Sequence, residues 1–136
     1  VTAPLMLDTA ALVGMHNPDD HHHAAAVRFL RSLVPGQQFH LSNYVLDETL
    51  TLLHRKAGLD RAVMVARTLQ SDPFHTIHQI TEELQEEAMG IFERQGPKEG
   101  LSFTDCTTVA LMRRLEITDI FTFDRGFAAL GLTVRP

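Results

Sequence analysis

Short apolar runs and longer segments with helical spacing alternate along the chain. The run from Leu5 to Thr9 is apolar and carries Asp8 at its end, which is typical of a buried strand with one charge at its carboxyl end. A second run, from Ile120 to Asp124, has the same design. Burying an unpaired ionised Asp costs several kcal/mol, so neither carboxylate is a natural choice for a core strand. If both strands are central in one parallel sheet, the two Asp residues meet where open α/β sheets bind ligands.

The remaining pattern predicts helices separated by short strands and turns. Strands that alternate with helices indicate a parallel, right-handed arrangement. The expected fold class is therefore α/β, a three-layer sandwich with a central, mainly parallel β-sheet of about five strands. We expect helices at 9–15, 20–33, 43–56, 60–70, 81–95 and 103–115, a loop at 96–100, and further strands at 39–42, 76–80 (at an edge) and 132–134.

The segment 20–33 has an apolar stripe at helical spacing. Asp19 or Asp20 is placed to cap its amino end, because Asp is a preferred N-cap residue. Pro35 and Gly36 stop it. We expect the stripe to face the core, and its residues are Ala24, Val27, Leu30 and Val34.

The segment 43–56 is the clearest amphipathic helix, and Gly58 follows its end. With a rotation of about 100° per residue, Glu48 lies at the border of the apolar face, whereas Asp47 points almost the opposite way. We therefore expect Glu48, and not Asp47, to look into a site beside the sheet. The residues that share the apolar face are Val45, Leu46, Thr49, Leu52 and Leu53.

Composition predicts a single globular domain, residues 1–136, because 44% hydrophobic and 21% charged residues is an ordinary balance for one domain of this length. The sequence contains no apolar run of about 20 residues and no leader-like start, so we expect a cytoplasmic protein without a membrane partner. The single Cys106 excludes an intramolecular disulfide and a multi-cysteine zinc site. We expect it to be a small buried hydrophobe.

The formal net charge of −5, from 17 acids and 12 Lys and Arg, argues at first against a nucleic-acid partner. Leaving out Asp8, Glu48, Asp105 and Asp124 brings the acids to 13, so these four residues account for most of the deficit. One or two bound divalent cations would offset this charge locally, and the site could then face a phosphate.

Each of these acids also has an ordinary structural explanation. Asp8 can cap the helix that follows it, Asp105 can pair with Ser102 in a helix cap, Glu48 can be a solvated helix residue, and Asp124 can open a turn. The four acids considered together favour a common site over four separate structural roles. The reason is that the alternation of strands and helices already predicts the sheet that would bring the two strand-terminal Asp residues together. That consistency favours a common site.

Carboxylates are the oxygen ligands that Mg²⁺ and Mn²⁺ prefer. Four acids can hold one ion and position its water shell, or support two ions roughly 3.5 to 4 Å apart. Hydroxyl groups that could support such a site belong to Thr9, Ser102, Thr104 and Thr122, for which caps and strand packing are equally good explanations.

Four motifs occur in order along the chain, and they are Leu7-Asp8-Thr9, Glu48, Phe103-Thr104-Asp105 and the run from Thr122 to Phe127. Together they resemble the PIN domain over nearly the whole chain, and the size is similar to that of the VapC-type toxins of prokaryotic toxin–antitoxin pairs. The resemblance implies a PIN-like fold and a Mg²⁺- or Mn²⁺-dependent endoribonuclease. It implies that Asp8, Glu48, Asp105 and Asp124 are the catalytic and metal-binding residues. It also implies a homodimer, an RNA substrate and, for a toxin, a cognate antitoxin.

In this interpretation a metal-activated water attacks the phosphorus and leaves a 5′-phosphate. A stand-alone PIN-domain RNA-processing nuclease and a non-catalytic PIN-like RNA- or protein-binding module remain alternatives. Phosphoryl transfer with Asp8 as nucleophile is disfavoured because no Lys is near either strand-terminal Asp in the sequence. The run from His21 to His23 is a competing metal ligand set, but consecutive helix residues fan out by about 100° each. We expect these three residues to be solvated on a helix.

Overall fold

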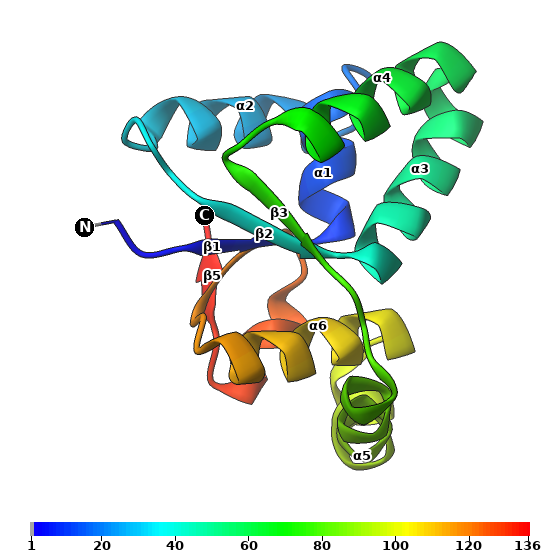
Figure 1. The fold of residues 1–136 in the computed structure, drawn as a ribbon, viewed down its shortest axis with the longest axis vertical. Helices are drawn as coiled ribbons and strands as arrows, with labels where there is room; N and C mark the ends of the chain where they lie inside the picture. Colours follow the sequence, from blue (N-terminus) through cyan, green and yellow to red (C-terminus); the bar gives the residue numbers. More distant parts are fainter. Residues whose placement is uncertain (1) are drawn as a thin grey trace.

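The protein is described by a computed structural model that covers residues 2–136. Within these residues, five parallel strands form one sheet in the order β3-β2-β1-β4-β5. The expected fold class is confirmed: helices cover both faces of the sheet, which gives three layers (Figure 1). The strands are β1 (Leu5–Leu7), β2 (Phe39–Ser42), β3 (His75–His78), β4 (Asp119–Phe121) and β5 (Thr133–Arg135).

The helices divide between the two faces of the sheet. In Figure 1, α1 to α4 lie on one side, while α5, α6 and the 3₁₀ helix η1 lie on the other. No helix in residues 2–136 combines the length and the apolar character that crossing a bilayer requires. The bounds are α1 (Thr9–His16), α2 (His23–Ser32), α3 (Asn43–Ala57), α4 (Leu59–Ser71), α5 (Glu82–Glu99), α6 (Phe103–Leu115) and η1 (Arg125–Leu130).

The central strand β1 is buried on both faces, as a continuous apolar run predicts. Leu5 and Leu7 pack with α1 to α4, whereas Met6 packs with α5 and α6, because successive strand residues point to opposite faces. Cys106 is fully buried in the second of these cores, as expected.

Strands β1 and β4 end at the same level of the sheet. Leu7 pairs with Phe121, and the backbone N–H of Asp8 donates to the Phe121 carbonyl at 3.2 Å. The two strand-terminal acids therefore emerge from neighbouring central strands, which confirms the arrangement expected from the two similar runs.

The predicted core face of α2 is only partly correct, because Leu30 packs against the core but the stripe misses the most buried residues. The helix begins at His23, and its buried residues are Ala26 and Phe29, while Ala24 is exposed and Val34 is 52% exposed. Several apolar residues on this helix leave room for more than one stripe, and the face that buries the large Phe29 ring removes more apolar area from water. The periodicity of apolar residues within the helix does not show which of its faces buries more apolar area.

The predicted loop at 96–100 is also wrong, because α5 continues to Glu99 through Gly96 and Pro97. Gly96 is buried against the Phe92 ring, where an added Cβ would lie 2.5 Å from a ring carbon. The helix ends at Gly100, whose φ of +69° is the left-handed conformation that favours glycine. Packing of this last part of the helix overrides the breakers in the sequence.

Candidate active site

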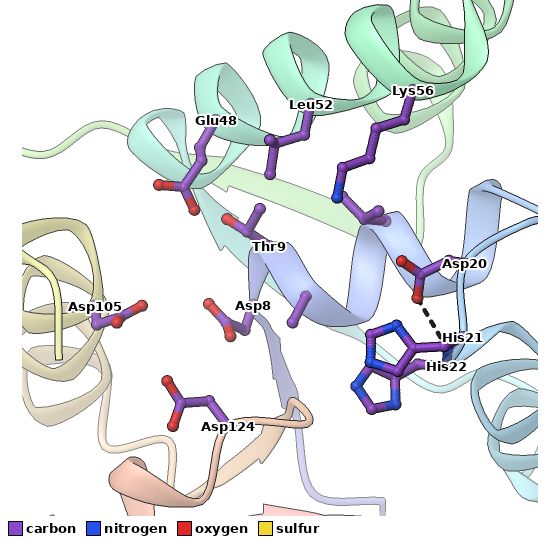
Figure 2. A pocket seen from close by; sticks show the side chains of 12 residues that line it. Asp8, Thr9, Asp20, His21, His22, Glu48, Leu52, Lys56, Asp105 and Asp124 are labelled. Carbon is purple, nitrogen blue, oxygen red and sulfur yellow. Dashed lines mark hydrogen bonds between the residues drawn. The ribbon is translucent and has the colours of Figure 1, made fainter. Parts of the chain in front are cut away.

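A cavity of about 350 Å³ lies at the carboxyl ends of the central strands (Figure 2). In Figure 2 the carboxylates of Asp8, Glu48, Asp105 and Asp124 point into one common space. The structure thus brings together all four residues that the sequence singled out, while their roles stay a prediction. The cavity is lined by Asp8, Thr9, Ala10, Val13, Asp20, His21, His22, Glu48, Leu52, Lys56, Asp105 and Asp124.

Asp8 is the most buried of the four acids, with 4% of its surface exposed. It occupies the N-cap position of α1 but makes no side-chain cap; its Oδ2 instead accepts a hydrogen bond from the Thr122 hydroxyl at 2.7 Å. Burial raises the pKa of Asp8 from 3.8 to about 7, with a further rise from the charge of Asp105, and the Thr122 hydrogen bond opposes both effects. The site therefore favours a proton or a cation beside this carboxylate.

Asp105 has the structural role that the cap interpretation gave it. Its Oδ2 accepts from the Ser102 N–H at 2.9 Å, and its own N–H donates to the Ser102 hydroxyl at 3.1 Å, which forms a capping box at the start of α6. Burial raises the pKa of Asp105, and the charges of Asp124 and Glu48 also raise it, against the Ser102 hydrogen bonds. The cap and the site thus coexist, because the cap fixes a carboxylate that also lines the cavity.

Asp124 likewise combines a turn with the site. Its Oδ1 accepts from the Gly126 N–H at 2.9 Å, and its N–H donates to the Thr122 hydroxyl at 3.0 Å. A Cβ on Gly126 would lie 2.7 Å from the Glu99 carbonyl oxygen, so this close turn requires glycine. The Thr122 hydroxyl is therefore the link between Asp8 and Asp124, and it orients both strand ends.

Helix α3 supplies the opposite wall of the cavity. Glu48, Leu52 and Lys56 follow one another at four-residue spacing on the helix face that lines the cavity. Asp47 is exposed and lines a separate hollow with residues of α4, such as Val63. The predicted orientation of the helix is thus confirmed.

Sequence reasoning missed four of the lining residues, Asp20, His21, His22 and Lys56. The expected helical placement is wrong for His21 and His22, because they lie in the turn before α2 and line the cavity, although His21 is exposed as expected. Asp20 does not cap α2; its Oδ2 accepts the N–H of His22 at 3.0 Å within that turn. Helical spacing could have found Lys56, because it continues the four-residue spacing of Glu48 and Leu52 on α3. No spacing rule reveals the other three residues, because a turn that folds back over α1 brings them to the acids.

The donor set fits a hard divalent cation. Five carboxylates face the cavity, and Lys56 is the single Lys or Arg in its lining. The buried Thr9 hydroxyl has no hydrogen-bond partner. Among residues 2–136, no three His, Cys, Asp or Glu side chains are arranged to hold an ion directly. Mg²⁺ needs no such group, because it commonly keeps several waters and binds one or two carboxylates.

The expected supporting hydroxyls divide into those that the site uses and one that it does not. Thr122 and Ser102 hydrogen bond Asp8 and Asp105, respectively, and Thr9 lines the cavity. Thr104 instead lines another surface hollow, on the far side of Glu48.

The fold and the acidic cavity together define a parallel α/β domain with its site at the carboxyl ends of the central strands. Residues 5–132 match the PIN domain, and the chain belongs to that family. The 23S rRNA-specific endonuclease VapC20 of Mycobacterium tuberculosis is 34% identical over 133 residues, which cover 97% of this chain and 98% of that protein. A VapC ribonuclease of Archaeoglobus fulgidus is 25% identical over 90% of this chain and 78% of its own length.

Solved structures show the same fold. The crystal structure of Mycobacterium tuberculosis VapC20, described as a Sarcin-Ricin loop cleaving toxin, matches with a TM-score of 0.86 and 33% identity over 97% of this chain and 99% of that one. FitAcB from Neisseria gonorrhoeae matches with a TM-score of 0.69 and 18% identity, over 97% and 96% of the two chains. A toxin–antitoxin complex from Klebsiella pneumoniae matches at 0.68 and 16%, over 99% and 97%. The last two likenesses concern the fold alone.

Proposed function

We propose that this chain is a Mg²⁺- or Mn²⁺-dependent endoribonuclease and the toxin of a toxin–antitoxin pair. The observation that carries the proposal is the convergence of Asp8, Glu48, Asp105 and Asp124 on one cavity, where burial and mutual repulsion raise the pKa of Asp8 to about 7. Such a cluster is unfavourable without a compensating cation. The proposal is supported by a relative that is 34% identical over almost the full length and is named an rRNA endonuclease.

In this proposal Asp8, Glu48, Asp105 and Asp124 would together hold the ion, in part through the waters that it keeps. When bound, the ion supplies a water of lowered pKa and stabilises charge on the phosphate. The chain's own residues pre-orient the carboxylates: the Thr122 hydroxyl holds Asp8, and the α6 capping box holds Asp105. Lys56, on the same wall as Glu48, offers an ammonium group to a substrate phosphate.

RNA is the proposed substrate, and ribosomes are the first form of it to test, since the 34% identical relative is named as specific for 23S rRNA. A cognate antitoxin is the proposed protein partner, because the solved structure that is 33% identical over 97% of this chain is described as a toxin. We also propose a homodimer. Exposed large hydrophobic residues on α4 would favour such an association, and they are Leu59, Val63 and Met64.

The test is RNA cleavage by the purified protein with Mg²⁺, with Mn²⁺ and with excess EDTA. We expect cleavage with either ion and none with the chelator, and restoration when Mn²⁺ is added back. Asp8→Ala should abolish cleavage, whereas Asp47→Ala, which removes a neighbouring exposed carboxylate, should retain it. Cleavage that persists in excess EDTA would show that the proposed mechanism is wrong.

A further inference from the structure

Three aromatic rings form a column at one wall of the acidic cavity. The rings of His22 and Phe123 are stacked, with centroids 4.1 Å apart and planes 2° from parallel. The ring of His21 follows at 3.9 Å from His22, tilted by 41°. His21 and His22 both line the cavity that holds Asp8 and Asp124 (Figure 2). The column therefore belongs to the same space as the acids, although the proposed chemistry does not use it.

The inner end of this column is anchored in the core. Phe123 contacts the ring of Phe121 edge to face at 6.0 Å, and Phe121 meets Phe29 in the same way at 4.6 Å. Phe121 is fully buried. At the other end, the backbone N–H of His22 donates to Asp20, which fixes the turn that carries the rings. The column is therefore packed against the core at Phe123 and exposed at His21.

A purely structural role does not account for the exposed end. Burial of apolar area explains Phe123 and the core-facing part of His22, but an exposed ring such as His21 gains little from it. A π-face held open beside a cavity suits a flat partner, and nucleobases are flat and stack on aromatic side chains in every sequence context. The other lining residues are five acids, Lys56 and four residues without a ring (Thr9, Ala10, Val13 and Leu52), and none of them offers a base an aromatic face.

We propose that the outer face of His21 is a stacking platform for a nucleobase of the RNA strand that enters the acidic cavity. This inference rests on the proposed ribonuclease function and names a substrate-positioning site within it. Because His21 lines the same cavity as Asp8 and Asp124, a base stacked on it would belong to the strand whose phosphate enters the acidic cavity. A base must leave its own stack to reach the platform, so the column favours single-stranded or looped RNA over a continuous duplex.

Binding tests the platform without requiring catalysis. Asp8→Asn serves as a cleavage-deficient background, and the probe is a single-stranded RNA with 2-aminopurine at successive positions. Stacking on His21 should quench one 2-aminopurine position, and His21→Ala should abolish that quenching and weaken binding by about tenfold. His21→Phe keeps a π-face and should retain both signals. His21→Lys introduces a positive charge without a ring and should behave like His21→Ala.

The matched control is His54→Ala, which removes an exposed imidazole that lines a different hollow. It should leave affinity and quenching unchanged. In the Asp8-containing protein with Mn²⁺, His21→Ala should raise KM while leaving kcat close to that of the parent, because the column positions substrate and touches no reacting atom.

The two proposals fail in different ways. If the parent cleaves RNA and His21→Ala has the same RNA affinity and KM as the parent, the stacking platform is wrong and the proposed ribonuclease function stands. If the parent never cleaves RNA but the RNA probe still binds with His21-dependent quenching, the ribonuclease is wrong and the platform stands. Retained binding by His21→Lys, with loss in His21→Phe, would replace stacking with simple charge attraction and overturn the platform.

Discussion

Replacing Asp8 by Asn should stabilise the metal-free protein at neutral to alkaline pH. The physical reason is the raised pKa of Asp8, about 7 in the folded protein against 3.8 in an ordinary environment. Between these values the folded state keeps a proton that the unfolded state has lost. The contribution of Asp8 to the stability of the parent is therefore most favourable below about pH 4 and falls as the pH rises to about 7, and above that the full cost of ionising Asp8 is present.

The size of the effect follows from the pKa difference and from what Asn retains. A difference of about 3 pKa units corresponds to a ceiling of about 4 kcal/mol at pH 8. Asn still accepts the Thr122 hydroxyl, but it buries an amide NH₂ whose desolvation costs about 1 to 3 kcal/mol. We expect a net stabilisation of about 1 to 2 kcal/mol, or roughly 3 to 6 °C in Tm for a domain of this size.

The assay is thermal unfolding of the parent, Asp8→Asn and Asp8→Ala in EDTA at pH 8 and pH 5, with Asp47→Asn as an exposed control. The gain from Asp8→Asn should shrink or reverse at pH 5, where the folded parent holds its proton. Adding Mg²⁺ at pH 8 should stabilise the parent by mass action and Asp8→Asn much less.

A simple helix cap or structural hydrogen bond predicts the opposite sign. Its removal costs stability at every pH and with or without metal, and Asn caps nearly as well as Asp. If Asp8→Asn and Asp8→Ala both lower Tm in EDTA at pH 8, and Mg²⁺ leaves the parent unchanged, the convergent cation site is refuted.

Two further predictions concern α3 and the assembly. Glu48→Ala should reduce RNA cleavage by at least tenfold and Asp47→Ala should not, because only Glu48 lines the acidic cavity. Steady-state cleavage rates with Mn²⁺ test this prediction. Loss of activity in Asp47→Ala but not in Glu48→Ala would contradict the geometry. The protein should self-associate through its exposed apolar residues, so light scattering at tens of micromolar should give twice the mass of the chain, and a monomer there would exclude a stable dimer.

Local pattern was sufficient for the main features of the site. The apolar runs before Asp8 and Asp124 predict two central strands, and the structure pairs Leu7 with Phe121 so that both acids leave the sheet at one level. The phase of α3 likewise separates Glu48 from Asp47. These inferences succeed because backbone geometry sets the periods of strands and helices, so the sequence of one segment is enough to show which residues share a face.

The acid caps show why single residues were ambiguous. Asp105 closes a capping box, and Asp124 closes a turn on Gly126, so the ordinary explanation of each is correct. Both also face the cavity with Asp8. Local hydrogen bonding and a shared site are compatible, because the bonds that orient a carboxylate do not determine what lies in front of it.

Tertiary structure alone decided the residues that complete the cavity. His21 and His22 reach the acids because the turn after α1 folds over the same strand ends. The core face of α2 was decided in the same way, by the area that Phe29 buries. Periodicity gives the direction of a side chain within its own element, whereas the partner it meets depends on how separate elements pack, and that choice follows from apolar area summed over the whole chain.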